Sequence, residues 1–316
     1  MVTARPDQAR PDDTRRDETR TDQTRTDRTR TDQERTDRTR TGPARPSSRA
    51  AGSTRTRLVP GLDGDVEVLT TGRGRPHTVL AHGAGGSIAT TRPYAGRVAG
   101  TRTFVHQRGH GRSHRPAGTT WGYGDLAGDL WAVADVVEAD RALGISMGAG
   151  ALLAGLAQDP DRFQRVVLVL PAVLDRVRED AATVRLGRFA DLLDAGDAQA
   201  VAAHLLADQP ATVRHDPAVV RWAHDRAEEL AGSGVADVLR VLVDRTPLTD
   251  PRLLQQVRCP VLVLGQEDDP LHPASVAREV ASLLPRSVLH VAGPGGIMWE
   301  HRERTRDLVG EFLSAH

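Results

Sequence analysis

Several residue types are rare in this sequence or missing from it. Lysine is absent: all 42 basic residues are arginine, and 42 acidic residues balance them, so the formal net charge is zero. A chain without net charge has no global field to attract nucleic acid or an anionic membrane. The missing lysine indicates a coding bias of a GC-rich genome, because arginine and lysine differ in recognition only where a planar fork of donors is needed.

Cysteine is almost absent, and long apolar runs are missing. The single cysteine, Cys259, cannot form an intramolecular disulfide, and its place before Pro260 and an apolar run predicts a buried structural thiol. The N-terminus lacks the apolar segment of a secretory signal. The longest apolar run, residues 166–174, is too short to span a bilayer. We therefore expect a cytoplasmic protein in a reducing compartment.

The first fifty residues lack the side chains that build a core. They contain 13 arginines and 10 acidic residues, but no Phe, Trp, Tyr, Ile or Leu, and residues 21–40 repeat a five-residue unit such as Thr-Asp-Gln-Thr-Arg. Such units offer no apolar face to a neighbour, so they cannot stack as a solenoid. We predict a disordered tail over residues 1–52, and a single folded domain over 53–316.

In that domain, short apolar runs alternate with segments of helical length. Strands are predicted at residues 65–69, 78–81, 103–105, 142–145, 166–170, 261–264 and 287–291, with helices at 123–139 and 147–158 among them. This alternation predicts an α/β fold with a mostly parallel sheet flanked by helices. Residues 174–250 instead show helix after helix, which predicts an inserted helical cap above the carboxyl edge of the sheet, where ligands bind.

One short motif could carry a nucleophile. Gly144-Ile-Ser146-Met-Gly148 matches the pattern G-x-S-x-G and stands between a predicted strand and a predicted helix of small residues. In such a turn the glycines let strand and helix approach closely, and the serine hydroxyl is exposed above the sheet. The sequence therefore predicts a nucleophile elbow at Ser146.

A glycine-rich loop follows the strand at 78–81. His82-Gly-Ala-Gly-Gly86 can direct the backbone N–H of Ala84 toward an oxyanion, together with the N–H of Met147. A phosphate-binding loop would need a different glycine pattern, which is not present. His82 itself is interpreted as a residue that packs the loop, not as a base.

Together these segments resemble the α/β-hydrolase superfamily, in its branch of esterases and lactonases with an HG-x-G loop and a helical cap. The resemblance covers residues 55–315 and includes Arg108-Gly-His-Gly-Arg-Ser113, which in the family usually follows an Asp; here His106 stands in that place. It also includes Asp161-Arg-Phe163 before a strand. The resemblance implies a catalytic triad in the chain order serine, acid, histidine.

Two aspartates compete for the role of the acid. The strand at 261–264 leads into Gly265-Gln-Glu-Asp268-Asp269-Pro-Leu-His272-Pro273, the type of loop in which the family places its Asp. Counting from Gly265 favours Asp268, whereas counting back from the Asp-Pro-x-His-Pro pattern favours Asp269. We prefer Asp269 and keep Asp268 as the alternative.

The histidine is the weak point of the resemblance. The family's base follows the last strand, and the matching turn here is Ala292-Gly-Pro-Gly-Gly296, so the expected base position is a glycine. His301, five residues further on, is the candidate substitute. His290 falls within a strand, where a structural role fits better. If the site lacks nothing but its base, a histidine placed at position 296 should complete the triad and raise the rate of ester hydrolysis.

Two functions follow from these observations. The first is a serine hydrolase that cleaves a small carboxylic ester, lactone or related acyl substrate through an acyl-enzyme at Ser146. The second is a catalytically impaired member of the same fold that binds a small ligand, because a triad without its base loses most of its rate. No cofactor is implied. A zinc site at His106, His110 and His114 is disfavoured, since Gly109 and Gly111 argue against one helix presenting them.

Overall fold

The computed structural model describes residues 55–178 and 180–315. Its centre is an eight-stranded sheet with the order β1-β2-β4-β3-β5-β6-β7-β8. β1 and β2 pair antiparallel, as do β2 and β4, and all other neighbours are parallel. The strands are β1 (Arg57–Pro60), β2 (Asp65–Gly72), β3 (His77–Ala81), β4 (Thr101–Val105), β5 (Arg141–Ile145), β6 (Arg165–Val169), β7 (Val261–Gln266) and β8 (Ser287–Ala292).

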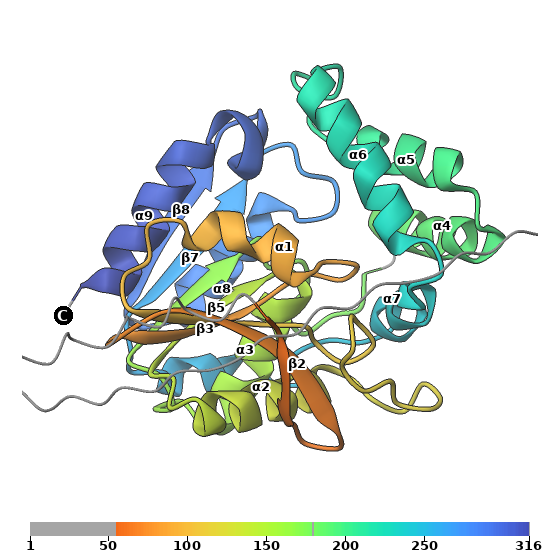
Figure 1. Ribbon diagram of the computed structural model, residues 1–316. Coiled ribbons are helices and arrows are strands. Elements are labelled where there is room, and N and C mark those ends of the chain that lie inside the picture. Colours follow the sequence, from red (N-terminus) through yellow and green to blue (C-terminus); the bar gives the residue numbers. More distant parts are fainter. Residues whose placement is uncertain (1–54, 179, 316) are drawn as a thin grey trace, which may run out of the picture. The chain divides into compact units, whose positions relative to one another are not determined.

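Side chains of the central strands alternate between two cores, one on each face of the sheet. In β6, Val166 and Leu168 join the core beneath α2 (Tyr123–Val136), α3 (Met147–Gln158) and α8 (Ala274–Leu283). Val167 and Val169 join the core beneath α1 (Ile88–Thr91) and α9 (Arg302–Ser314). Because both faces of these strands are covered, they read as continuous apolar runs. The predicted three-layer α/β architecture is confirmed (Figure 1).

The helical cap is also confirmed. Between β6 and β7 the described residues form four α-helices, then one short 3-10 helix, and no strand; Figure 1 shows the α-helices set to one side of the sheet. Three of them begin at an aspartate whose side chain accepts a backbone N–H of the first turn, which fixes where each helix starts. They are α4 (Ala181–Ala195), α5 (Ala198–Ala207), α6 (Pro217–Leu230) and α7 (Val235–Val243).

The remaining helices are short: η1 (Arg92–Ala95) follows α1 and precedes β4, η2 (Pro251–Gln256) leads from α7 to β7, and η3 (Gly296–Glu300), a π-helical turn, leads from β8 to α9. Cys259 is buried as predicted, and burial raises the pKa of its thiol to about 11. Within the described ranges, no helix is both long and apolar enough to cross a membrane. The predicted tail at residues 1–52 lies outside the described residues.

Candidate active site

Ser146 lies at the junction of β5 and α3 in a backbone conformation that few residues adopt. Its φ and ψ are 49° and −106°, a positive φ that is costly for any residue with a Cβ. The strain is tolerated because the turn is fixed on both sides: the Ser146 N–H donates to Val169 O, and Ser146 O accepts from the Gly150 N–H. The hydroxyl therefore projects from a rigid corner beside the first turn of α3.

The two glycines of the motif allow the close approach of strand and helix. A Cβ at Gly144 would come within 2.3 Å of Gly148 O, and a Cβ at Gly148 would come within 2.6 Å of Ala81 O. Both atoms belong to the backbone and cannot move aside. The pattern G-x-S-x-G is therefore required here by packing, and the local geometry is that of a nucleophile elbow.

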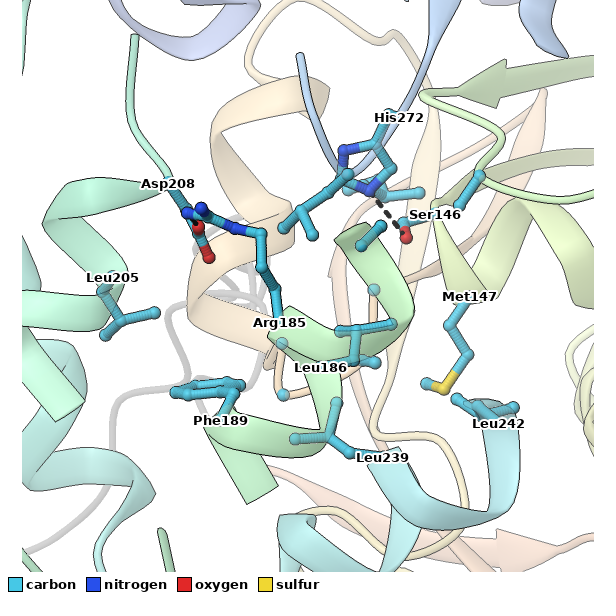
Figure 2. Close-up of a pocket in the computed structure, with 18 of the residues that line it drawn as sticks. Ser146, Met147, Arg185, Leu186, Phe189, Leu205, Asp208, Leu239, Leu242 and His272 are labelled. Atoms are coloured by element: carbon cyan, nitrogen blue, oxygen red, sulfur yellow. Dashed lines mark hydrogen bonds and ion pairs between the residues drawn. The ribbon is translucent and has the colours of Figure 1, made fainter. Parts of the chain in front are cut away.

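The histidine that reaches Ser146 is His272. Its Nε2 lies 3.0 Å from Ser146 Oγ, as the dashed line in Figure 2 marks, and its Nδ1 lies 3.1 Å from Asp269 Oδ2. With the Nδ1 proton donated to the carboxylate, Nε2 is free to accept the proton of the serine hydroxyl. Serine, histidine and aspartate thus form one chain of hydrogen bonds with the geometry of a catalytic triad.

Asp269 and Asp268 have different surroundings, although they are adjacent. Asp269 Oδ1 accepts the backbone N–H groups of Leu271 and His272, each at 2.9 Å. Burial raises the pKa of Asp269, but the His272 ring and these N–H groups outweigh burial and hold that pKa below its ordinary value. Asp268 is exposed, has a φ of 57°, and contacts neither His272 nor Ser146. The structure therefore places the preferred aspartate next to the histidine.

The expectation for the histidine needs a correction. His301 begins α9, and its Nε2 lies 2.9 Å from the carbonyl oxygen of Pro294, so it is bonded within its own turn and not to Ser146. Gly296 has a φ of 84°, and a Cβ there would lie 2.8 Å from Trp299 Cδ1 and 3.3 Å from Pro210 Cγ. The turn after β8 is thus closed to a histidine at 296, and the histidine that contacts Ser146 lies on another loop.

From the sequence, His272 served only to locate the acid, as part of the Asp-Pro-x-His-Pro pattern. The signal was the spacing Asp269-Pro-Leu-His272, because three residues in a tight loop can bring an imidazole back onto the carboxylate that precedes it. The Asp side chain accepts the N–H groups of residues two and three positions later, as such turns do. The pair was missed because the family resemblance places the histidine after the last strand and not in the loop of the acid.

The loop that carries both residues is held by Arg178, which stands between β6 and the cap. Its Nη1 donates to Leu271 O at 2.6 Å, and its Nη2 donates to Pro270 O at 3.2 Å. Asp180 accepts from the same guanidinium and thereby orients it. The side chain of Arg178 is only 16% exposed, and its charge strengthens these bonds, of which the one to Leu271 O is partly buried. One arginine therefore ties the loop of Asp269 and His272 to the base of the cap.

The glycine-rich loop after β3 rests on three histidines. His82 is fully buried, donates from Nδ1 to Gly83 O and accepts the Gln107 N–H at Nε2. His110 accepts the Gly85 N–H, and His106 accepts the Ile88 N–H. Each ring uses one nitrogen as an acceptor, and burial lowers the pKa of His82 and of His110, which favours their neutral form. The interpretation of His82 as a packing residue agrees with these contacts.

The other histidine of that region also has a structural partner. His114 Nε2 lies 3.2 Å from Asp129 Oδ2, which in turn accepts from the buried Arg108. The described residues contain no cluster of three or more side chains able to hold a metal ion. The motif from Arg108 to Ser113 therefore forms a hydrogen-bonded support for the loops near the site.

A cavity of about 320 Å³ lies between Ser146 and the cap. Gly83 to Gly86, Ser146 and His272 form its floor, and α4, α5, α6 and α7 supply its walls (Figure 2). Most of the walls are apolar and include Leu186, Phe189, Leu205, Leu239 and Leu242. The size and lining are typical of a pocket for a small organic molecule.

Comparison with known proteins agrees with this geometry. Residues 76–298 match the model of the alpha/beta hydrolase fold family. The chain belongs to the α/β-hydrolase family. It is 31% identical over 232 residues to a putative carbamate hydrolase RutD from a Caulobacter species, which covers 70% of this chain and 84% of that protein.

Solved structures show the same fold at lower identity. An esterase from Exiguobacterium antarcticum is 19% identical with a TM-score of 0.69, and covers 82% of this chain and 99% of its own. An enol-lactonase from Burkholderia xenovorans is 20% identical with a TM-score of 0.69. The match covers 82% of this chain and 100% of the enol-lactonase. At this identity the likeness establishes the α/β-hydrolase fold alone. The predicted family and fold are confirmed.

Proposed function

We propose that this α/β-hydrolase cleaves a small carboxylic ester, lactone or carbamate through an acyl-enzyme at Ser146. The observation that carries the proposal is the contact of 3.0 Å between His272 Nε2 and Ser146 Oγ, with Asp269 bonded to the other ring nitrogen. The named relatives include a putative carbamate hydrolase, an esterase and an enol-lactonase, which supports hydrolysis of an acyl compound.

In the acylation step, Ser146 Oγ attacks the carbonyl carbon and His272 Nε2 takes the hydroxyl proton. Asp269 holds the resulting imidazolium by its hydrogen bond and its charge. His272 then returns the proton to the leaving oxygen or nitrogen as the bond to the acyl group breaks. Water attacks the acyl-enzyme, again giving its proton to His272, and the acid is released with Ser146 restored.

The negative charge that develops on the carbonyl oxygen needs donors near Ser146. Ala84 and Met147 line the cavity, and Met147 is the first residue of α3, whose opening N–H groups have no partner inside the helix. We assign their two backbone N–H groups to the oxyanion hole. Such donors act without reorganisation, because the loop and the helix already hold them in place.

The catalytically impaired alternative rested on the glycine at position 296. His272 supplies a hydrogen-bonded partner for Ser146 from a different loop, so the reason for expecting impairment no longer applies. No observation in the described residues favours a binding function over hydrolysis.

The direct test is hydrolysis of short p-nitrophenyl esters. We expect the wild-type protein to turn them over and Ser146→Ala to lose at least about a thousandfold of kcat, in line with the loss of a triad member. A fluorophosphonate should label the wild type on Ser146, as mass spectrometry can show. Ser282→Ala is the matched control, because that hydroxyl donates to Glu279 O within α8 and does not line the cavity. Equal activity or labelling in Ser146→Ala would refute the assignment.

A further inference from the structure

One arginine lies on the buried face of a cap helix. The inward side of α6 is otherwise apolar and consists of Val219, Ala223, Ala227 and Leu230. Arg226 shares this side, and its side chain is only 7% exposed. Burial of a guanidinium costs free energy unless the charge is paired and its donors are bonded. An arginine in this position therefore calls for a partner.

The partner within the protein satisfies only part of that need. Glu229, three residues further along α6, forms an ion pair with Arg226 Nη1, but the Glu229 side chain is 48% exposed and remains accessible to water. Among the described residues, Arg226 makes no other ion pair and no hydrogen bond that fixes its remaining donors. A planar fork of N–H groups is thus left for a ligand.

Arg226 lines the same cavity as Ser146 and His272. Leu230, one turn further along α6, lies over the glycine-rich loop: a Cβ built on Gly85 would be 3.7 Å from its side chain. Burial lowers the pKa of His110 beneath that loop, and the positive charge of Arg226 adds to the effect. The guanidinium therefore belongs to the cap side of the cavity whose other side holds the glycine-rich loop and Ser146.

The other two arginines of the cavity differ from Arg226 in the partners that hold their charge: Asp208 beside Arg185 is itself largely buried, with a side chain 11% exposed. Arg185 pairs with Asp208, which also lines the cavity, and Figure 2 shows the two side chains together on one wall. Arg178 donates to the carbonyl groups of the loop that carries His272. Among these three arginines, Arg226 is the one whose charge, within the described residues, is balanced only by a carboxylate that stays open to water, so its fork is the best placed to receive a ligand.

We propose that Arg226 binds a carboxylate of the substrate, so that the enzyme prefers acyl compounds with an anionic carboxylate a few bonds from the scissile carbonyl. This inference rests on the proposed hydrolase function. The two oxygens of a carboxylate match two parallel N–H groups of one guanidinium. The apolar walls formed by Leu186, Phe189 and Leu239 suit the hydrocarbon segment between the two carbonyl groups.

Matched ester pairs test this preference. In the first pair, the monophenyl ester of glutaric acid carries the carboxylate on the acyl side, and phenyl pentanoate is its neutral partner. In the second pair, O-acetyl-4-hydroxybutyrate carries the carboxylate on the alcohol side of the ester, and butyl acetate is its neutral partner. For the wild type, we expect kcat/KM to favour the anionic member of at least one pair by about tenfold or more, which corresponds to ~1.4 kcal/mol.

The variant Arg226→Gln should abolish that preference, so that the ratio of kcat/KM between the anionic and the neutral member of each pair falls to about threefold or less. Arg221→Gln is the matched control, because Arg221 is an exposed arginine of the same helix and does not line the cavity. The proposal is overturned if the wild type favours neither anionic ester, or if Arg226→Gln retains the preference. If the wild type hydrolyses none of these esters, the result would instead refute the proposed hydrolase function.

A measurement on the wild type alone keeps the proposal testable if Arg226→Gln does not fold. Glutarate should inhibit the hydrolysis of phenyl pentanoate competitively, at a concentration at least about tenfold lower than 1,5-pentanediol. Equal inhibition by the acid and the diol would show that the cavity does not recognise a carboxylate.

Discussion

At the scale of single residues, His272 and Asp269 share one short loop, so the position of both depends on what holds that loop. In the order of elements that the family resemblance implied, acid and base come from separate turns. Here a shift of the loop over residues 269–272 would move the base and its orienting group together, away from Ser146. The bonds from Arg178 to Leu271 O and Pro270 O oppose such a shift.

We therefore expect Arg178→Gln to lower kcat for a p-nitrophenyl ester by about tenfold to a hundredfold, with KM changed by less than about threefold. Misplacement of a catalytic group by about 1 Å is enough for such a loss. Steady-state kinetics measure both constants. Arg176→Gln is the control, because Arg176 lies two residues away, is exposed and pairs with Glu279 instead of the loop. Full kcat in Arg178→Gln would show that the loop holds its place without the arginine.

At the scale of elements, the π-helical turn after β8 explains why a histidine cannot be restored there. Gly296 combines a positive φ with close contacts to Trp299 and Pro210, and the Trp299 indole N–H donates to Gln209 in the cap. This turn is therefore part of the packing between α9 and the cap. Its glycine is required by the backbone, whatever the chemistry of the site.

The contacts of Gly296 overturn the expectation that Gly296→His would complete the triad. We predict that Gly296→His gains no ester hydrolysis and that Gly296→Ala alone lowers the free energy of unfolding by about 1 kcal/mol or more. Gly293→Ala is the matched control, since a Cβ there meets only His301 Nε2 at 3.9 Å. Urea unfolding measures the stabilities. A rate gain of a hundredfold in a folded Gly296→His variant would contradict this account.

The histidines beneath the glycine-rich loop make the stability of the protein depend on pH. Burial is the main cause that lowers the pKa of His110, to about 4, and it lowers that of His82 as well. Because the unfolded chain binds protons at the ordinary value of about 6.5, it holds more protons than the folded chain between that pH and about 4. Stability should therefore fall as the pH falls through this window, and change little above pH 7.

For His110 alone, the loss between pH 7 and pH 5 should be on the order of 2 kcal/mol. Urea unfolding at the two pH values measures it, and His110→Gln should show a smaller difference between them than the wild type. His215→Gln serves as the control because His215 makes no contact with the glycine-rich loop. If wild type and His110→Gln lose the same stability on acidification, the neutral ring of His110 is not responsible.

At the scale of the whole molecule, periodicity and motif context were enough to predict the sheet, the cap and the elbow. The buried strands are continuous apolar runs, and the four cap helices fall within the predicted range 174–250. Strand β1 was not predicted, because four residues with a single buried side chain leave no pattern to read. The histidine that contacts Ser146 was missed for a different reason: the local spacing of Asp269 and His272 indicates their pairing, but their contact with Ser146 joins residues 126 positions apart, which no local pattern reports.

The same scale also shows how the chain can depart from the expected order of its family and keep the site. Parallel strands β5 and β7 are separated in the sheet only by β6, so the loops after their carboxyl ends open on one edge. Ser146 follows β5, and both Asp269 and His272 follow β7. A base can therefore move from the turn after β8 to the loop after β7 without any change of fold.

The central claim is that His272 is the base of this hydrolase, and one kinetic comparison tests it. We measure kcat/KM for a p-nitrophenyl ester in the wild type, in His272→Ala and in His301→Ala, after confirming by circular dichroism that each is folded. The account predicts a loss of at least about a thousandfold in His272→Ala and less than about threefold in His301→Ala. The reverse pattern, with activity retained in His272→Ala and lost in His301→Ala, would contradict it.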